Sequence, residues 1–432
     1  MPAICLYFHV HQPTRLRKFS IFSHKPPSLR ERYFDDGLNS HYFVKAAQKC
    51  YLPTNALLLR LIEENGKRFR ISYSITGTFL EQARRYSPET LDSFRRLAST
   101  GCVEFLDETY YHSLASIYED SWEFERQVRA HTELIRDEFR QTPKVFRNTE
   151  LLYSNRIAEA VSGMGFKGML TEGIEWVLGW RSPNYVYRAR FSPRLKVLLR
   201  NYKLSDDVGY RFGARWWPGW PLTADKYANW LAACDGPTAN IFMDYETFGE
   251  HHWEGTGIHE FLRHLPGEAL KHGNLSFATV GEVLEGNEAV GEIDVPSVLS
   301  WADLERDASA WLGNPIQQAC FGELEALSKE IRGVPDGELQ DAYGLLQTSD
   351  HLYYLCTKNW ADGDVHKHFS PYKDKGPYDN FINYMNVLRD FRSLVQERAG
   401  EASRQRAAHG AGVRMQALKE KVELFEKGVG VP

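Results

Sequence analysis

Two short apolar runs of the sequence end in carboxylates that could act together in acid–base chemistry. The run KVFRNTE ends on Glu150, and the run NIFMD ends on Asp244. If both runs are strands of one parallel sheet closed into a barrel, their carboxyl ends meet at the rim where catalytic groups gather. Such a pair suits glycoside hydrolysis: one carboxylate attacks the anomeric carbon or supports a water, and the other donates a proton. The same side chains could instead cap the next helix or pair with a neighbouring Arg.

The sequence neighbours of the two carboxylates predict different protonation states. Glu246 and Glu250 crowd Asp244, and nearby anions raise the pKa of a carboxyl group. Arg147 precedes Glu150 closely and favours its ionised form. The sequence therefore predicts that Asp244 donates the proton and that Glu150 stays charged.

Two histidines end the first apolar run, in the segment HVHQP. His9 and His11 are two residues apart, so they face the same side of a strand. They could bind a metal ion, contact sugar hydroxyls, or simply be a pair of hydrogen-bonded histidines at the rim. Since the sequence places no third ligand beside them, we expect no metal site.

The segment GCVEFLDETYYHSL places an acid inside a predicted strand and a histidine on the following loop. Glu104 would be buried there, and a buried acid needs a partner. The partner could be His9 or His11, in which case Glu104 forms an internal salt bridge or contributes to the site. His112 follows on the loop and is a further candidate for the site.

Tryptophans cluster in the segment RFGARWWPGWPL, which has the composition of a loop. Exposure of Trp216, Trp217 and Trp220 together would be costly without a purpose. The rings could fill a gap in the core, or they could stack on the apolar faces of sugar rings. The aromatic content of 13% fits either a large core or a carbohydrate cleft.

Two polar segments of the C-terminal third also offer candidate ligands. TSDHLYYL contains Asp350 and His351, and WADGDVHKHFSPY contains Trp360 followed by alternating Asp and His residues. The second segment lacks the glycine and the terminal glutamate of a calcium-binding loop. It is therefore interpreted as a polar loop.

The order of predicted elements favours an α/β barrel followed by helices. Apolar strand-like runs alternate with helical patterns, which is typical of a parallel sheet covered by helices. Eight runs in about 280 residues favour a barrel over an open sheet, and they are ICLYFHV, FRISYSI, CVEFL, KVFRN, KGMLT, VLLRNY, NIFMD and LSFATV. We predict a catalytic barrel over 1–290 and a helical domain over 291–400 that completes the cleft. Over 401–432 we predict a flexible segment, at 401–414, and a short C-terminal helix.

Composition excludes several classes of partner. A net charge of −5 gives no basic footprint for nucleic acid or an anionic membrane. No run approaches the roughly 18 apolar residues of a membrane helix, and the first residues do not have the pattern of a signal peptide. The six scattered cysteines, without a CxxC pair, indicate reduced core residues of a cytoplasmic protein. The oligomeric state is not predicted.

Taken together, the segments resemble glycoside hydrolase family 57, in its α-amylase-like branch. The motifs occur in order along residues 3–390 as HVHQP, GCVEFLDETYYHSL, FRNTELLYSN, FMDYETFGEHHW and TSDHLYYL, with LSWADLERDASAWLGN between the last two. The resemblance implies an incomplete TIM-like (β/α)7 barrel followed by an α-helical domain. It also implies a reaction that retains configuration and requires no metal or cofactor.

Roles are carried over from the motif positions as expectations. Glu150 would be the nucleophile and Asp244 the general acid/base. The residues expected to contact an α-1,4-glucan are His9, His11, Glu104, His112, Trp217, Trp220, Glu246, His251, Asp350 and Trp360. Hydrolysis of the α-amylase type is favoured over 4-α-glucanotransferase or branching activity on the same carboxylates. A metal-dependent hydrolase such as a polysaccharide deacetylase or mannosidase, and a non-catalytic glucan-binding protein, are the alternatives from other classes.

Overall fold

Seven of the strands described in this protein form one ring. The computed structural model describes residues 2–20, 22, 24–358 and 376–426. Seven parallel strands make up the ring: β1 Ala3–Val10, β2 Ile71–Ile75, β3 Val103–Phe105, β4 Val145–Phe146, β5 Gly168–Glu172, β7 Ser192–Arg200 and β8 Thr238–Asp244. Two further contacts close it. A parallel bridge joins Asp107, just after β3, to Phe146 of β4, and the amide of Asn201, just after β7, donates to the carbonyl of Asn240 in β8 at 2.8 Å.

The predicted (β/α)7 barrel is therefore confirmed, and one of the eight strand candidates lies outside the ring. The run LSFATV gives only β9, Ser276–Phe277, which pairs with the start of β1. Two short strands were not predicted: β6, Val186–Ala189, lies antiparallel to β7, and β10, Glu292–Ile293, pairs with β6. The ring strands are almost wholly apolar because both of their faces are covered.

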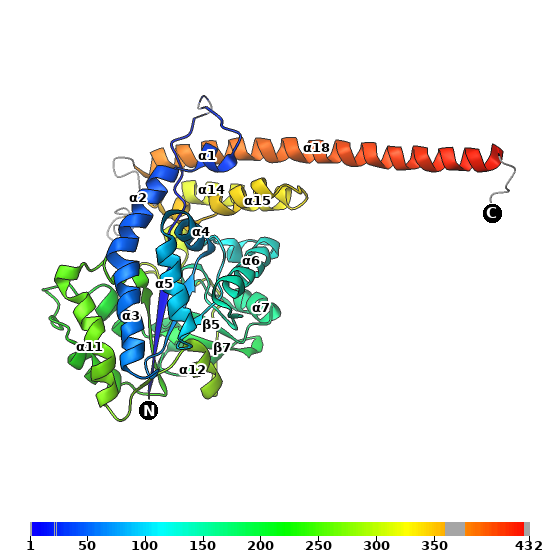
Figure 1. The fold of residues 1–432 in the computed structure, drawn as a ribbon. Coiled ribbons are helices and arrows are strands. Elements are labelled where there is room, and N and C mark those ends of the chain that lie inside the picture. Colours follow the sequence, from blue (N-terminus) through cyan, green and yellow to red (C-terminus); the bar gives the residue numbers. More distant parts are fainter. Residues whose placement is uncertain (1, 21, 23, 359–375, 427–432) are drawn as a thin grey trace.

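Helices cover the outside of the ring, as the alternating apolar pattern predicts (Figure 1). Along the barrel part of the chain they are α1 Leu29–Tyr33, α2 Asp36–Ala46, α3 Leu52–Glu64, α4 Gly77–Tyr86, α5 Pro88–Ser99, α6 Trp122–Phe139, α7 Asn155–Gly163, α8 Glu175–Leu178, α9 Tyr202–Gly209, α10 Ala224–Ala232, α11 Ile258–Lys271 and α12 Val280–Gly286. Several begin at a side-chain cap: the hydroxyl of Ser154, for example, accepts from the amide of Ile157 at the start of α7.

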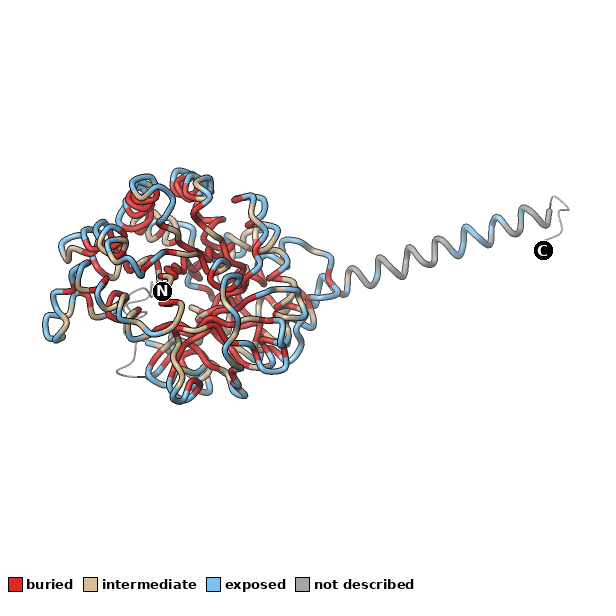
Figure 2. The backbone as a smooth tube through the Cα atoms, turned by 90° about the horizontal axis from the view of Figure 1, so that it is seen from below, coloured by how far each residue is buried: buried red, intermediate tan, exposed pale blue. Residues whose placement is uncertain are grey.

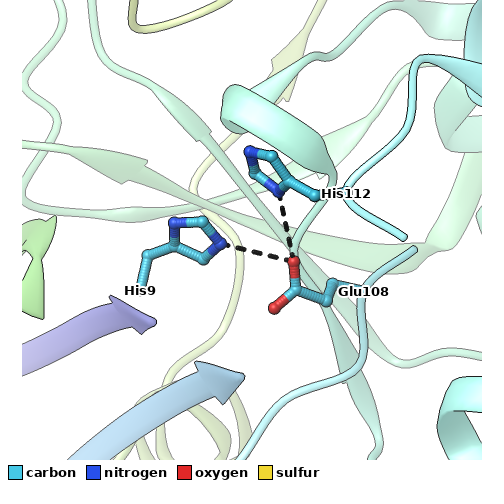
Figure 3. A group of neighbouring side chains, drawn as sticks. All are labelled: His9, Glu108 and His112. Atoms are coloured by element: carbon cyan, nitrogen blue, oxygen red, sulfur yellow. Dashed lines mark hydrogen bonds and ion pairs between the residues drawn. The ribbon is translucent and has the colours of Figure 1, made fainter. Parts of the chain in front are cut away.

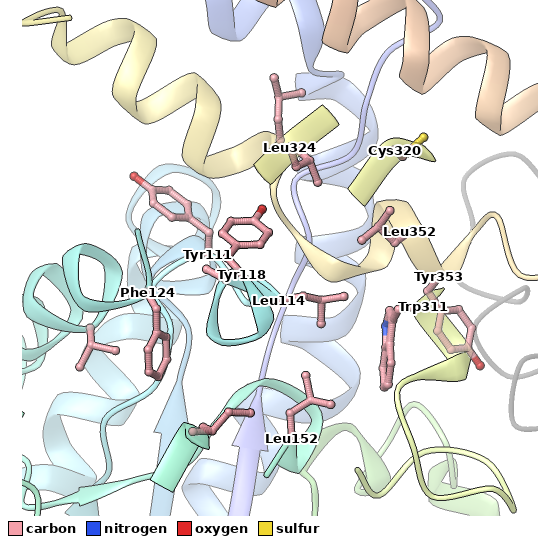
Figure 4. Packing of buried hydrophobic residues seen from close by; sticks show 14 of the residues in the cluster. Tyr111, Leu114, Tyr118, Phe124, Leu152, Trp311, Cys320, Leu324, Leu352 and Tyr353 are labelled. Carbon is pink, nitrogen blue, oxygen red and sulfur yellow. The ribbon is translucent and has the colours of Figure 1, made fainter. Parts of the chain in front are cut away.

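The C-terminal part is helical, and it shares a hydrophobic core with the barrel loops. Its helices are α13 Ser309–Leu312, α14 Pro315–Ile331, α15 Gly337–Leu346, α16 Ser349–Tyr353 and α18 Pro377–Glu426. Figure 4 shows this core, in which Tyr111 and Leu114 of the loop after β3 lie in one cluster with Leu324, Leu352 and Trp311 of the helices. Burial of this cluster fixes the helices over the carboxyl ends of the strands.

The long helix α18 differs from the sequence-based expectation for the C-terminus. Residues 401–414, for which a loose segment is predicted, are helical and continue α18 without a break. The segment is rich in Ala, the strongest helix former, and an isolated Gly costs a helix only about 1 kcal/mol. Figures 1 and 2 show the helix passing over the barrel and continuing beyond it, away from the buried part of the molecule.

Two further observations bear on the predicted surroundings of the protein. All six cysteines are free, in accord with the interpretation as reduced thiols. Among the described residues, no helix combines the length and the apolar character that crossing a membrane requires.

Candidate active site

The carboxyl ends of the ring strands surround one cavity. Its lining includes both predicted carboxylates, Glu150 and Asp244, and a set of polar side chains from distant parts of the sequence. The full lining is His9, His11, Gln12, Pro13, Arg15, His112, Glu150, Arg200, Gly209, Tyr210, Met243, Asp244, Glu246, Thr247, His251, Trp301, Ala302, Asp350 and Tyr353. Two carboxylates on one rim are the arrangement that the strand-end pattern predicts.

Glu150 is held in an unusual backbone conformation directly after β4. Its φ of 53° lies in the left-handed region that non-glycine residues rarely adopt, and such conformations concentrate at functional sites. Its carboxylate receives two hydrogen bonds. Trp301 Nε1 donates to Oε2 at 2.6 Å, and His112 Nε2 donates to Oε1 at 3.1 Å. These donors fix the direction of the carboxylate.

Three histidine rings are stacked between the two carboxylates. The ring of His112 lies 4.1 Å from that of His11 and 4.8 Å from that of His9, with interplanar angles of 26° and 24°. His9 Nδ1 lies 3.3 Å from Asp244 Oδ1, and His9 Nε2 lies 3.3 Å from Glu108 Oε2. Glu150 and Asp244 are therefore connected through adjacent histidine rings.

Glu108 lies beneath this stack and contacts two of its rings. Figure 3 shows its carboxylate between His9 and His112, and the Oε2 atom lies 3.7 Å from His112 Nδ1. Although burial raises the pKa of Glu108, the two histidines and Arg147 lower it well below its usual range. Burial also opposes the charge on His112, but the neighbouring carboxylates of Glu108 and Glu150 outweigh burial and raise its pKa to about 9. His112 is thus a cation at neutral pH that stabilises a charged Glu150.

The raised pKa predicted for Asp244 is wrong. Burial raises the pKa of Asp244, but the hydrogen bond and charge of His9 prevail and hold it well below its usual range. The raised pKa belongs to its neighbour instead. Burial and the charge of Asp244 raise the pKa of Glu246 to about 8, and the Tyr51 hydroxyl donates to Glu246 Oε1 at 2.5 Å. The sequence correctly predicted that one of these neighbouring carboxyls has a raised pKa, but that carboxyl is Glu246. The pKa of Asp244 is lowered because its partner, His9, comes from β1.

A model of glycosyl hydrolase family 57 matches residues 5–296. The chain belongs to this family. A protein of Methanocaldococcus jannaschii named "Putative alpha-amylase" is 48% identical to it over 404 residues, which cover 91% of this chain and 85% of that protein.

Solved structures of two enzymes share the fold of this chain at low sequence identity. The branching enzyme of Thermococcus kodakaraensis superposes with a TM-score of 0.67 at 13% identity, covering 91% of this chain and 90% of the enzyme. The 4-alpha-glucanotransferase of Thermococcus litoralis superposes with a TM-score of 0.63 at 15% identity. That match covers 89% of this chain but only 59% of the longer enzyme.

Eight of the twelve predicted site residues of this family 57 protein line the cavity. Three of the others lie elsewhere, and one lies outside the described residues. Those at the cavity are Glu150, Asp244, His9, His11, His112, Glu246, His251 and Asp350. His11 connects two of the motifs, because its Nε2 lies 3.1 Å from Asp350 Oδ2 of α16 and its Nδ1 lies 3.0 Å from Thr76 Oγ1.

Glu104 is not part of the lining of this cavity, contrary to the prediction. Its Oε2 accepts hydrogen bonds from Ser72 Oγ at 3.1 Å and from the amide of Gly281 at 2.8 Å. Gly281 lies in the first turn of α12, so Glu104 satisfies a free amide at a helix start. The acid that contacts the histidines comes four residues later, because only Glu108 lies beyond the end of β3.

Trp217 and Trp220 also lie outside the catalytic cavity. Trp217 packs on Trp230, with ring centroids 6.0 Å apart, and Trp220 lines a second cavity on the outer side of the same loop. Trp217 therefore packs against the hydrophobic core, which is the alternative to sugar stacking that the sequence left open. Trp360 lies outside the described residues.

Several residues of the site were not among the predicted site residues. Those that contact the carboxylates, the histidines or each other include Glu108, Trp301, Arg200 and Arg147. The guanidinium groups of Arg147 and Arg200 lie over the Trp301 ring, 4.9 and 5.5 Å from its centre. Arg147 is fully buried, and its guanidinium has no hydrogen-bond partner within the described part of the chain. Trp301 lies in the motif LSWADLERD, so the position of this motif among the ordered family motifs could have identified Trp301 as a site residue.

Two groups of side chains in the described residues could hold a metal ion. One is His9, Glu108 and His112, and the other is His11, His112 and Asp350. Both groups include His112. The second group supplies the third ligand that the sequence did not place beside the histidines.

Proposed function

We propose that this protein is a retaining glycoside hydrolase that acts on α-1,4-glucans, with Glu150 as nucleophile and Asp244 as general acid/base. The observation that carries the proposal is the arrangement of these carboxylates on one cavity, each hydrogen-bonded by a different histidine of the stack. Family membership and the α-amylase name of the M. jannaschii relative support the substrate class.

In the first step, a Glu150 oxygen attacks the anomeric carbon while the glycosidic C–O bond breaks. The leaving oxygen takes a proton from Asp244, and a glycosyl-enzyme forms on Glu150. In the second step, Asp244 accepts a proton from water, whose oxygen attacks the anomeric carbon and releases Glu150. Two displacements retain the configuration. His112 and Trp301 hold Glu150 in position for both steps.

The proton for the first step is held by Asp244 and Glu246 together. The unfavourable interaction of two adjacent carboxylates in a buried site leaves them one proton at neutral pH. In the free protein this proton lies on Glu246, whose pKa is about 8. Asp244 delivers it, because Asp244 is the last residue of β8, lines the cavity and has a side chain that is 35% exposed.

The pH dependence of turnover tests this shared proton. We expect wild-type turnover to fall as the pH rises through about 8, where Glu246 loses its proton. In Glu246→Gln the proton can lie only on Asp244, whose pKa is held low by His9, so the falling limb should move to more acidic pH. The check is kcat/KM for maltoheptaose over the stable pH range. Superimposable profiles would show that Glu246 does not share the catalytic proton.

Product analysis tests the proposed reaction itself. Purified protein is incubated with amylose and with maltoheptaose, and reducing ends are measured together with product lengths. Shorter maltooligosaccharides with rising reducing ends support the hydrolase. Longer or branched products without a gain in reducing ends would show a 4-α-glucanotransferase or branching enzyme, in which a sugar hydroxyl replaces water in the second step. No change in either glucan would contradict both readings.

A metal-dependent hydrolase is a second candidate, because His11, His112 and Asp350 together provide a donor set. Two imidazoles and a carboxylate are ligands that suit zinc. In that case a chelator would abolish activity and added zinc would restore it. Activity that is unaffected by prolonged chelation, with no metal bound to the purified protein, would reject the metal-dependent hydrolase and support the two-carboxylate reaction.

A further inference from the structure

A second cavity lies outside the catalytic site, on the other side of a shared wall. The wall consists of the segments 209–213 and 247–252, which contribute residues to both cavities. His252 Nε2 donates to the carbonyl of Gly209 at 3.0 Å and ties the two segments together. The outer cavity lies between this wall and the helices α3 and α11.

Two exposed tryptophans line this outer cavity. Trp220 is 43% exposed and Trp253 is 72% exposed, although large aromatic side chains are normally buried. The two come from different loops, after α9 and after β8. Phe212 lines the same cavity and is itself buried against Phe261, 5.3 Å between ring centroids. Aromatic faces from separate loops that converge on one groove indicate a ligand with flat apolar faces.

The rest of the lining is polar and carries both signs of charge. Lys49, Arg215 and Arg263 are cationic, Glu254 and Glu260 are anionic, and Arg263 Nε lies 3.1 Å from Glu260 Oε1. The Arg215 guanidinium lies 5.8 Å from the centre of the Trp220 ring. Gln48 and His259 add neutral donors and acceptors. A lining of mixed charge does not suit nucleic acid, which requires a basic surface. Aromatic faces together with many donors and acceptors suit a neutral sugar, which has apolar ring faces and a periphery of hydroxyls.

We propose that this groove is a second α-glucan-binding site, in which Trp220 and Trp253 stack on glucose rings of a chain. The ligand class rests on the proposed function, because a protein that acts on α-glucans encounters long chains. The site would hold one part of a polymer while another part enters the catalytic cavity across the wall. Short oligosaccharides, which cannot reach both cavities, would gain nothing from it.

Binding to polymer in the absence of turnover tests the proposal. Glu150→Gln serves as the parent, and its mobility is measured in native gels that contain amylopectin. We expect Trp220→Ala with Trp253→Ala to weaken the retardation about tenfold, since each aromatic contact contributes a few-fold. Trp253→Phe keeps an aromatic face and should retain most of the binding. Trp216→Ala is the matched control, because Trp216 is 80% exposed but does not line the groove.

Equal retardation of the parent and the double variant would overturn the proposal, and so would equal losses in the Trp216→Ala control. Thermal unfolding of each variant checks the fold, and the single variant Trp253→Ala suffices if the double variant is unstable. A failure of the proposed function gives a different result. In that case wild type would turn over no α-glucan, while Trp-dependent binding to amylopectin could still be measured. Normal turnover without Trp-dependent binding would reject only the groove.

Discussion

Glu150→Gln is expected to lower turnover of maltoheptaose on the order of 10⁴-fold, the scale of losing a covalent nucleophile. The substitution preserves the size of the side chain, and Trp301 Nε1 can still donate to the amide oxygen. It removes the negative charge that attacks the anomeric carbon, so no glycosyl-enzyme forms. Initial rates from reducing-end release give the measurement. Glu159→Gln is the matched control, because Glu159 is exposed on α7.

Chemical rescue separates the loss of a nucleophile from a general loss of structure. In Glu150→Ala, azide can occupy the space of the missing carboxylate. With an α-maltosyl fluoride substrate, azide would attack the anomeric carbon from the β face and expel fluoride, which gives a β-glycosyl azide. Rescue with this inverted product would establish the position of Glu150. Turnover of maltoheptaose by Glu150→Gln at the wild-type rate would contradict the assignment.

Asp244→Asn is expected to lower turnover of maltoheptaose by about 10²–10⁴-fold, the range for a lost general acid. The effect should depend on the leaving group. Fluoride leaves without a proton, so the first step on α-maltosyl fluoride should be nearly normal. The second step lacks its base, and a glycosyl group should therefore accumulate on Glu150. A burst of fluoride, and a mass increase on the peptide that contains Glu150, would measure this.

Glu246→Gln is the matched control for Asp244→Asn, because it changes the neighbouring carboxyl with which Asp244 is proposed to share the catalytic proton. If Asp244 delivers the proton, the activity of Glu246→Gln should recover at acidic pH, whereas that of Asp244→Asn should stay low at every pH. Azide should rescue Asp244→Ala as the α-glycosyl azide, since Glu150 is still present to form the intermediate. If instead Glu246→Gln shows the fluoride burst and the trapped intermediate, Glu246 is the acid/base.

The sequence predicted the barrel and the position of its two carboxylates because both follow from local patterns. An apolar run followed by polar residues identifies a buried strand and its carboxyl end, and all strands of a parallel barrel end at one rim. Glu150 and Asp244 could therefore be placed together without any knowledge of their neighbours. His9 lies near the end of β1 in the same way, and His11 and His112 follow strands. The one extra strand, at LSFATV, was miscounted because a run of apolar residues does not reveal which strand it pairs with.

The neighbours of those residues were decided only by the tertiary structure. Asp244 is only two residues from Glu246, but its pKa is lowered by His9, which lies on a strand more than 200 residues away. Glu104 and Glu108 are four residues apart. Glu104 lies within β3 and caps a helix, whereas Glu108 lies beyond the end of β3 and contacts the histidines.

Trp301 reaches Glu150 from beyond the barrel strands, and Trp220 lies across a wall from the cavity in which it was expected. Local sequence fixes which residues end a strand, because strand formation depends on short apolar runs. Charge and hydrogen bonding depend on distances of a few ångströms between segments remote in sequence, and only the packed fold sets those distances.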